Sequence, residues 1–428
     1  MSNLKLLDCD MHVHGPNSGG VSKNMSIPLM AEQAQLKGLH VLATGDCLNK
    51  EWLVHLKNSL IESNGTFSFK DSEIQFILST EISDLHNVHQ LCYFPDFASV
   101  DLFREKLIQQ KVKLDGKGFG RPWVRIGAEK LAETVIDECK GLIGPAHGFT
   151  PYFGVFAHFN SVQQCFGSMA SEIKFMELGL SADSDIADLI ESNHSLQYFS
   201  CSDAHSAWSD KLGREFMRIR MTEGSLNELK KVLDLKGERR IETNIGLDAR
   251  EGKYHCTACS ECFAKYSLDQ ALKLKMKCMQ CGKSIKRGVR DLALQLHNPE
   301  SKSKPEYRAE YVRSIPLAEI IKIAFKAENA HSKKVQTVWR NFVEEFKSEI
   351  AILLDVPIEN LIQKNPEVGK KIQAFRNNWV LFMAGGGGNY GVPIICDSLK
   401  ELEQKKKELK NKLDCHSELQ AQKILTEF

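Results

Sequence analysis

Two features are missing from this chain, and each excludes a class of protein. No apolar run approaches the roughly 20 residues that a helix needs to cross a bilayer. The first residues also lack the basic stretch followed by an apolar one that marks a secretory signal. We therefore expect a cytoplasmic protein with no membrane partner.

Net charge is also scarce, at +1 over 428 residues, so the whole chain shows no preference for a polyanionic partner. Cysteine, by contrast, is plentiful, with 13 residues. In a protein without a secretory signal, such cysteines are expected to be thiols and metal ligands and not a disulfide framework.

The start of the chain carries a row of ligand-type side chains, Asp10, His12 and His14, directly followed by a turn-forming run from Gly15 to Gly20. In a strand, alternate residues share one face, so these three side chains are predicted to point the same way. The pattern favours a metal site where this strand ends.

Up to about residue 245, short apolar runs alternate with helical stretches. This alternation predicts an α/β fold with a mainly parallel sheet. The strand-like runs are 4–7, 39–43, 75–78, 88–93, 141–143, 175–178 and 198–199, and the first helical stretch is 26–37.

Polar residues follow several of these predicted strands. If the strands form a barrel, their ends converge on one face, where such folds carry their chemistry. We expect two or three divalent ions, zinc, magnesium or manganese, to bind there, because carboxylates and imidazoles are mixed in one site. The candidate ligands are His12, His14, Asp46, Glu81, His89, His147, Asp203 and His205.

These motifs resemble those of the PHP (polymerase and histidinol phosphatase) superfamily, which implies a metal-dependent phosphoesterase on a distorted (β/α)7 barrel. The resemblance rests on the 10–14 stretch, Glu81 with His89, the His147 segment and Ser202-Asp203-Ala204-His205. One departure is Cys47, which follows Asp46 where many members have histidine.

A second region contains two Cys-x-x-Cys pairs, Cys256 with Cys259 and Cys278 with Cys281, separated by 18 residues. This spacing predicts a zinc ribbon with one structural Zn²⁺ held by four thiolates. Cys262 lies outside this pairing, and we expect it to be a free thiol.

The cysteine pairs lie in a basic stretch, because residues 250–313 contain 14 Lys and Arg but only 7 Asp and Glu. One interpretation is a surface for DNA phosphates, with Lys283, Lys286 and Arg287 as contacts. The other is a solvated lysine-rich face. Charge alone does not separate the two.

The chain then turns helical and reaches a glycine-rich run, Gly385 to Gly388, followed by Asn389-Tyr390-Gly391. Because no Lys-Ser or Lys-Thr follows, a nucleotide-binding P-loop is not supported. The run is either an ordinary tight turn or a loop that touches nucleic acid through Gly386, Gly387 and Tyr390.

The order of these parts resembles the endonuclease Q family, and the resemblance extends to about Ile395. It predicts a PHP domain at 1–245, a zinc-ribbon domain at 246–300, a helical DNA-binding domain at 301–395 and an amphipathic tail at 396–428.

The resemblance implies a DNA repair endonuclease that cuts 5′ of deaminated bases (uracil, hypoxanthine, xanthine) or abasic sites. The predicted catalytic residues are His12, His14, Glu81, His147 and Asp203, and damaged DNA is the partner. Because the phosphate and not the base is cut, selectivity requires that the damaged nucleotide be flipped into a pocket. The 147–152 and 177–181 loops are candidates for its lining.

Two other functions stay open. One is a phosphatase that acts on a small phosphate ester, although such an enzyme has no need of a basic ribbon and a helical domain. The other is a catalytically silent protein that binds DNA lesions, against which the retained ligand residues argue.

The last seven residues, 422–428, resemble the peptide by which repair proteins dock on the DNA sliding clamp. The pattern is a glutamine, an aliphatic residue and an aromatic residue spaced three apart: Gln422, Leu425 and Phe428. The alternative is a plain helix end.

Overall fold

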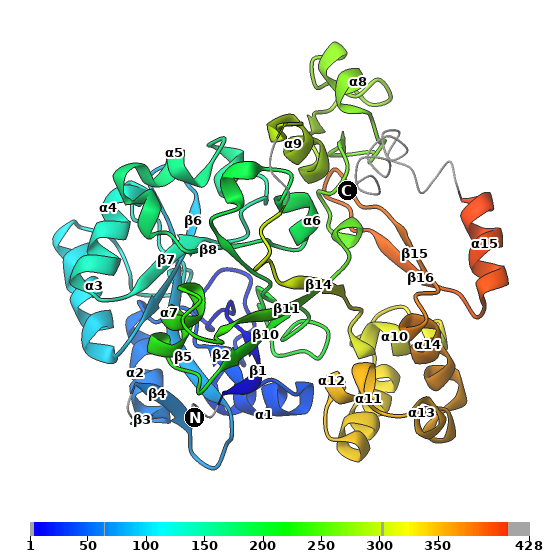
Figure 1. Cartoon of the computed structure of the whole chain (residues 1–428), viewed down its shortest axis with the longest axis horizontal. Coiled ribbons are helices and arrows are strands. Elements are labelled where there is room, and N and C mark those ends of the chain that lie inside the picture. The colour runs from blue at the N-terminus through cyan, green and yellow to red at the C-terminus, as the bar shows by residue number, and fades with distance from the viewer. Residues whose placement is uncertain (1–3, 64, 301–303, 410–428) are drawn as a thin grey trace.

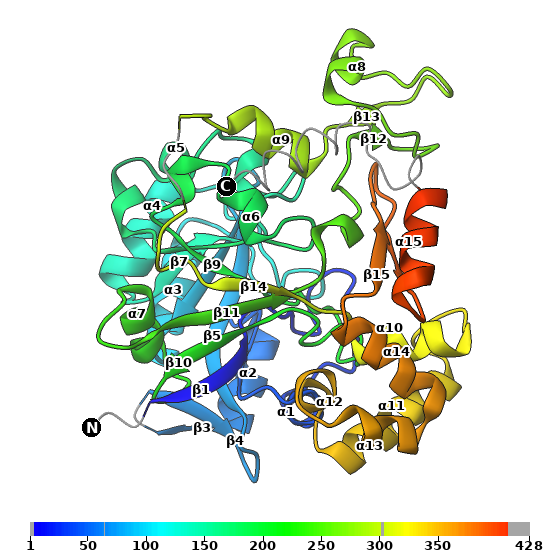
Figure 2. The ribbon, with the colours of Figure 1, turned by 45° about the vertical axis from the view of Figure 1, so that its right-hand side comes forward.

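The computed structural model describes residues 4–63, 65–300 and 304–409. It shows a large α/β body, a small cysteine-bearing module at one edge and a group of helices beside the body (Figures 1 and 2). Within the described residues, no helix has both the length and the apolar character needed to cross a membrane.

A ten-stranded sheet organises the body. Its strands pair in the order β14-β11-β10-β1-β2-β5-β4-β3, and β6 connects β5 to β7. They are β1 (Lys5–Asp10), β2 (Val41–Ala43), β3 (Leu60–Ser63), β4 (Thr66–Phe69), β5 (Gln75–Ser83), β6 (His89–Phe94), β7 (Leu142–Pro145), β10 (Phe216–Met221), β11 (Arg240–Gly246) and β14 (Glu310–Arg313). A separate parallel pair follows β7 and consists of β8 (Phe175–Glu177) and β9 (Gln197–Phe199).

The sheet is mixed, so the prediction of a mainly parallel sheet is wrong. β1, β2 and β5 are parallel neighbours, but β5, β6 and β7 run antiparallel, as do β1, β10 and β11. The reason is local: β5 and β6 are joined by the short turn at residues 84–88, and a turn this short can join only antiparallel strands.

Helices cover the body's sheet. The first, α1, begins where Ser26 caps the Leu29 amide and ends at Gly38, whose φ of +98° is left-handed. The α-helices are α1 (Ile27–Lys37), α2 (Lys50–Ser59), α3 (Phe97–Gln109), α4 (Ala128–Ala132), α5 (Val162–Phe166), α6 (Ser184–Ala187) and α7 (Leu226–Leu233). The body also contains one π-helix, η1 (Glu133–Glu138), and three 3₁₀-helices, η2 (Val155–Ala157), η3 (Gly167–Glu172) and η4 (Glu191–Asn193).

After β11 the chain leaves the body and forms the cysteine module, residues 249–296. It consists of η5 (Ala249–Glu251), β12 (Ala258–Cys259), α8 (Leu268–Lys273), β13 (Ile285–Lys286) and α9 (Val289–Leu296). One face of α9 packs into the body's core through Val289, Leu292 and Ala293. The chain then returns to the body, because β14 pairs in parallel with β11.

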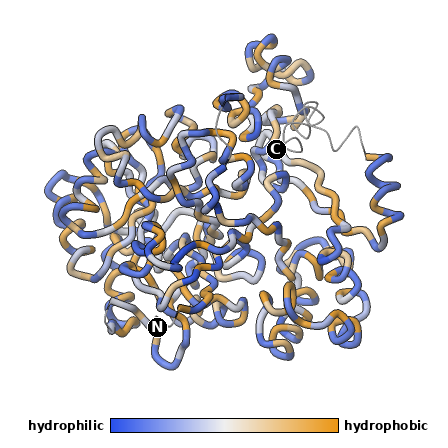
Figure 3. The backbone as a smooth tube through the Cα atoms, in the orientation of Figure 1, coloured by the Kyte–Doolittle hydropathy of each residue, from blue (hydrophilic) through white to orange (hydrophobic). Residues whose placement is uncertain are grey.

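The helical unit follows, with its own apolar core around Trp339 and Phe342. Its helices are α10 (Leu317–Phe325), α11 (Lys333–Phe346), α12 (Glu349–Leu354), α13 (Ile358–Lys364) and α14 (Pro366–Arg376). A hairpin of β15 (Val380–Met383) and β16 (Val392–Ile395) and the helix α15 (Leu399–Glu408) come last. Figure 3 shows α15 as mostly hydrophilic, and none of its residues is buried.

Candidate active site

Seven of the eight predicted ligands gather at one end of the body. His12 and His14 follow β1 in an extended stretch that bridges to Ala204 through Val13, and their ring centres lie 5.1 Å apart. Glu81 lies in β5 and His89 begins β6. The others follow strands: His147 after β7, and Asp203 and His205 after β9.

The donor atoms form three overlapping groups, and in each group they lie within 4.8 Å of one another. The first group is His12, His14 and Glu81; the second is His14, Asp203 and His205; the third is Glu81, His89 and His147. Because Glu81 and His14 belong to two groups each, the arrangement has the form of a cluster of adjacent cation sites.

Glu81 lies at the centre of these contacts. Its Oε1 is 2.8 Å from His89 Nδ1 and 2.9 Å from His147 Nε2, and its Oε2 is 3.4 Å from His14 Nε2. Arg121 Nη1 lies 3.1 Å from the same Oε2. Burial alone raises the pKa of Glu81, but His89 and Arg121 outweigh burial and hold this pKa well below its usual value.

The chemistry of the donor set fits divalent cations. His12 Nδ1 donates to Glu177 Oε2 at 2.8 Å, which leaves Nε2 turned toward the cluster, buried and without a hydrogen-bond partner. An unpartnered buried nitrogen is costly unless a ligand takes it up. Burial alone lowers the pKa of His12, yet Glu177 and Asp203 raise it to about 9, as expected where negative charge is in excess.

Asp46 does not join the three groups, although it was predicted to be a ligand. Its Oδ1 lies 3.1 Å from His14 Nδ1, on the side of the ring away from the cluster, and its Oδ2 accepts the Gly15 amide at 2.7 Å. Asp46 is thus a carboxylate that orients a histidine, which is the usual arrangement behind metal-binding imidazoles.

Asp10, the first residue of the opening row, is also turned away from the cluster. Its carboxylate accepts the backbone amides of Ser202 and Gly213, both at 3.0 Å. It therefore joins β1 to the loop that carries Asp203. Cys47, at the position where a histidine is common, is fully buried in the apolar core.

Two residues of the site, Glu177 and Arg121, were not among the predicted ligands or catalytic residues. Glu177 was only a candidate for the base pocket, yet it orients His12 and also accepts the His147 amide at 2.8 Å. It ends β8, so the strand-end rule that selected the other residues applies to it as well. Arg121 lies in an irregular segment after several glycines, where no strand signal marked it.

A cavity of about 350 Å³ opens beside the cluster. Its walls come from three parts of the chain: the body, including the 150–153 and 179–181 loops, Lys253 and Tyr254 of the module, and Tyr390 of the β15–β16 hairpin. Residues far apart in sequence therefore enclose one space next to the histidines.

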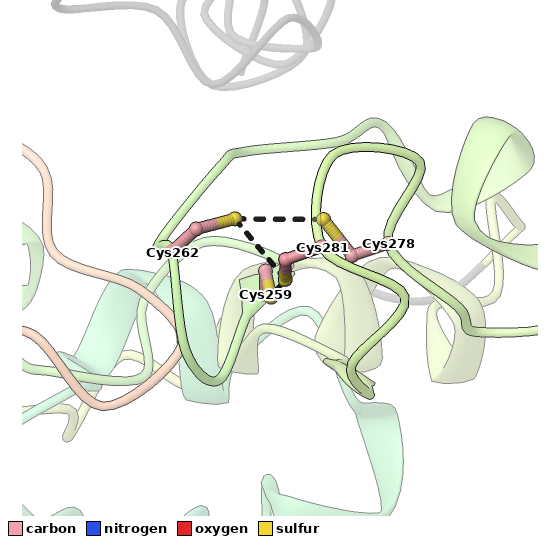
Figure 4. Close-up of side chains that lie close together, drawn as sticks. All are labelled: Cys259, Cys262, Cys278 and Cys281. Atoms are coloured by element: carbon pink, nitrogen blue, oxygen red, sulfur yellow. Dashed lines mark hydrogen bonds between the residues drawn. The ribbon is translucent and has the colours of Figure 1, made fainter.

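The cysteine module brings together Cys259, Cys262, Cys278 and Cys281, and this set corrects the predicted one (Figure 4). The Sγ atoms of Cys262 and Cys278 are 3.5 Å apart, and those of Cys259 and Cys281 are 3.4 Å apart. Cys256 is held elsewhere, because its amide donates to Gly385 at 2.9 Å and its side chain packs on Ala384.

The residues predicted to contact DNA differ in their exposure to solvent. Lys283 and Arg287 are exposed, Lys286 is half-buried with its ammonium 4.8 Å from the ring centre of Tyr152, and Tyr390 is 56% exposed. The glycine-rich loop does not reach the surface at Gly386 and Gly387, which are buried against the backbone of Cys256 and Cys259. The predicted clamp residues, Gln422, Leu425 and Phe428, lie outside the described residues.

Comparison with known proteins gives one family model and two uncharacterised relatives. The family model of the MJ0043 C-terminal domain matches residues 316–379. The uncharacterised protein MJ0043 of Methanocaldococcus jannaschii is 37% identical over 57% of this chain, a stretch that spans 31% of that relative's length. The uncharacterised protein YqxK of Bacillus subtilis is 26% identical over 91% of this chain and 99% of its own length.

Two solved structures match nearly the whole chain. The lesion-specific endonuclease PfuEndoQ of Pyrococcus furiosus is 41% identical, with a TM-score of 0.85 over 94% of this chain and 99% of its own. Endonuclease Q in complex with a 27-mer duplex that carries an abasic lesion at the active site is 42% identical, with a TM-score of 0.86 over 93% and 98% of the two chains. Identity at this level over almost the full length of both chains shows that the protein belongs to the endonuclease Q family.

Proposed function

We propose that the protein is a DNA repair endonuclease that needs divalent metal ions and cuts the phosphodiester bond 5′ of a deaminated base (uracil, hypoxanthine or xanthine) or an abasic site. The observation that carries the proposal is the cluster of three donor groups beside a cavity, in a chain that matches, at 42% identity, an endonuclease solved with an abasic duplex.

The body is proposed to be a distorted (β/α)7 barrel of the PHP type, with two or three zinc, magnesium or manganese ions at its histidine end. His12, His14, Glu81, His89, His147, Asp203 and His205 would hold these ions. Bound there, divalent ions supply positive charge that activates water and neutralises a phosphodiester under attack.

The protein's own residues prepare this chemistry. Asp46 and Glu177 each hold one imidazole through Nδ1, so that the opposite nitrogen faces the reaction site. Arg121 offsets the charge of Glu81 and lines the cavity, where its remaining N–H groups can donate to phosphate oxygens. Burial of His12, His14 and Glu81 excludes bulk water from their side of the cluster and strengthens these interactions.

The cavity is proposed to receive the extruded nucleotide. Its volume of about 350 Å³ falls in the usual range for small-ligand pockets. Because deaminated bases are mispaired and abasic sites lack a base, their nucleotides cost the least free energy to extrude, which gives selectivity for damage before any base is read.

The cysteine module is proposed to be a zinc ribbon, in which one Zn²⁺ bound by the four clustered thiolates is structural. Only Cys259, Ala271, Cys278 and Ile285 are buried in the module's own core, so the module is too small to be held together by burial alone. Its exposed Lys283 and Arg287 are proposed to contact DNA, together with Lys286, which lies over the Tyr152 ring, and Tyr390 of the hairpin, which lines the cavity. The segment 422–428 is proposed to bind the DNA sliding clamp.

Endonuclease activity is tested with end-labelled duplexes that carry one deoxyuridine, deoxyinosine or abasic site, incubated with magnesium, manganese or zinc. We expect one metal-dependent nick on the lesion strand, 5′ of the lesion, and no cut in the undamaged duplex. Asp203→Asn should abolish the nick, whereas Asp101→Asn, a surface carboxylate paired with Lys57, should leave the nick intact. No nick, with phosphate released from small esters instead, would refute the proposal.

A further inference from the structure

An extended segment, residues 121–125, runs beside the strand that carries Glu81. It pairs with Ser83, two residues beyond Glu81: the Ser83 amide donates to Pro122 at 2.9 Å, and the Val124 amide donates to Ser83 at 2.8 Å. The backbone of this segment is therefore held against the strand that carries Glu81, and the segment is not a free loop.

The segment alternates as a strand does. Pro122 and Val124 are buried and Trp123 between them is exposed, because alternate residues of an extended chain share one face. Arg125 is exposed beside Trp123, and Arg121 is half-buried and turned toward Glu81. A cation, an aromatic ring and a second cation therefore follow one another along the chain. This order begins inside the cavity, which Arg121 lines, and leads away from it.

The Trp123 ring is exposed but held in place. Its side chain is 52% exposed, and its indole nitrogen donates to the Asp84 carbonyl at 2.8 Å. The guanidinium of Arg125 lies 4.4 Å from the ring centre. A φ of +55° at Arg125, rare for a residue with a side chain, accompanies this stacking.

The surrounding charge favours a polyanion. Residues 111–125 contain five basic residues and one acidic one, Asp115, whose carboxylate is already paired with Arg104 at 3.1 Å. Lys113, Lys117 and Arg125 form no ion pair with any residue in the described part of the chain. Their charge is thus available to an outside partner.

We propose that Arg121, Trp123 and Arg125 form a track that binds the DNA strand next to the nucleotide being cut. Arg121 contacts the phosphate at the reaction centre, Trp123 stacks on a neighbouring base, and Arg125 contacts a further phosphate. This inference rests on the proposed function and adds to it the surface that holds the flanking strand. Bases stack on aromatic rings whatever their sequence, so the track gives affinity without sequence preference.

Binding is measured first in the Asp203→Asn background, which is expected not to cut and keeps the module's metal, by fluorescence anisotropy of a labelled duplex with one abasic site. We expect Trp123→Ala to weaken binding about tenfold and Trp123→Phe, which keeps a ring, to weaken it less than about threefold. Arg125→Gln should lower the salt dependence of binding by about one phosphate contact. Tyr307→Ala is the control, because Tyr307 is an exposed aromatic that lies near the start of β11, at the opposite end of the sheet from His12.

Single-turnover nicking then separates this inference from the proposed function. If the wild-type protein nicks damaged DNA but Trp123→Ala and Arg125→Gln both bind and cut as the wild type does, the track is refuted. If the wild-type protein does not nick but Trp123→Ala still weakens binding, the proposed function fails and the track stands. Arg125→Gln changes an exposed side chain, so its folding is not in question, and circular dichroism checks the fold of Trp123→Ala.

Discussion

At the scale of single residues, the site depends on carboxylates of two kinds. Glu81 and Asp203 face the cluster and share donor groups with histidines, whereas Asp46 and Glu177 lie behind histidine rings and orient them. Burial alone lowers the pKa of His14, but Asp46 and Asp203 raise it well above its ordinary value. The two kinds of carboxylate should therefore respond differently to the same substitution.

Asp46→Asn tests this difference. We expect the variant to keep every ion at saturating metal but to bind metal about 10–100-fold more weakly, or to nick more slowly by the same factor, because only the orientation of His14 is lost. Metal content by mass spectrometry and nicking rates at several metal concentrations give the answer. A variant that lacks one ion even at saturating metal would show that Asp46 is itself a ligand.

At the scale of elements, the cysteine module shows how a spacing rule can be satisfied twice. Cys256, Cys259 and Cys262 are three residues apart, so either neighbouring pair forms a Cys-x-x-Cys motif with an acceptable distance to Cys278. The structure separates the two by backbone pairing, because the amide of Cys256 is bonded to the loop at Gly385. No spacing within the module contains that information.

Two serine variants distinguish the motifs. Cys262→Ser is expected to release the module's metal ion and to unfold the module, since three thiolates no longer close the site. Cys256→Ser should retain the ion. Zinc content per chain, measured after dialysis, checks both, and the reverse result would restore the pairing predicted from sequence.

Much of the fold was predictable because its signals are local. All seven predicted strand runs overlap observed strands, and α1 begins directly after Ser26, its N-cap residue. The antiparallel direction of β10, β11 and the β3–β4 hairpin was not predictable, because these strands were not among the predicted ones. For β5 and β6, the predicted runs 75–78 and 88–93 leave a gap that hides how short the turn at 84–88 is. β14 was missed for a different reason: its four residues pair with β11, which lies more than 60 residues earlier in the chain.

The sequence also predicted which residues belong to the site, but not what each of them contacts. His12, His147 and Asp203 stand out because strand ends converge, and that rule needs only the order of strands. What each side chain contacts across the site does not follow from that order. Glu177 and His12 are 165 residues apart, so their contact exists only after the body has folded.

At the scale of the whole molecule, a buried ion pair joins the helical unit to the body. Lys37, the last residue of α1, donates to Glu349 of α12 at 2.8 Å and to the Ser209 carbonyl at 2.6 Å. Glu349 also accepts the Trp339 indole at 2.6 Å and the Leu317 amide at 3.0 Å. This single network connects the helical unit to the loop that follows His205.

Lys37→Met is expected to lower the free energy of unfolding by about 3 kcal/mol or more, because it leaves a buried carboxylate without its cation. The exposed pair of Lys57 and Asp101 provides the control, and Lys57→Met should cost less than about 1 kcal/mol. Urea unfolding measures both. Equal effects of the two substitutions would show that the buried pair does not hold the helical unit.

The return of the chain to β11 as β14 has a consequence for folding. Residues 247–309 form a loop whose two ends lie on neighbouring strands, so closing this loop costs chain entropy. For a flexible loop of this length, the length-dependent part of the cost is about 4 kcal/mol. A metal ion held by the four thiols would cross-link part of the loop and shorten its free length. Such an ion would therefore contribute to completing the edge of the sheet that carries the site, as well as to the module's own fold.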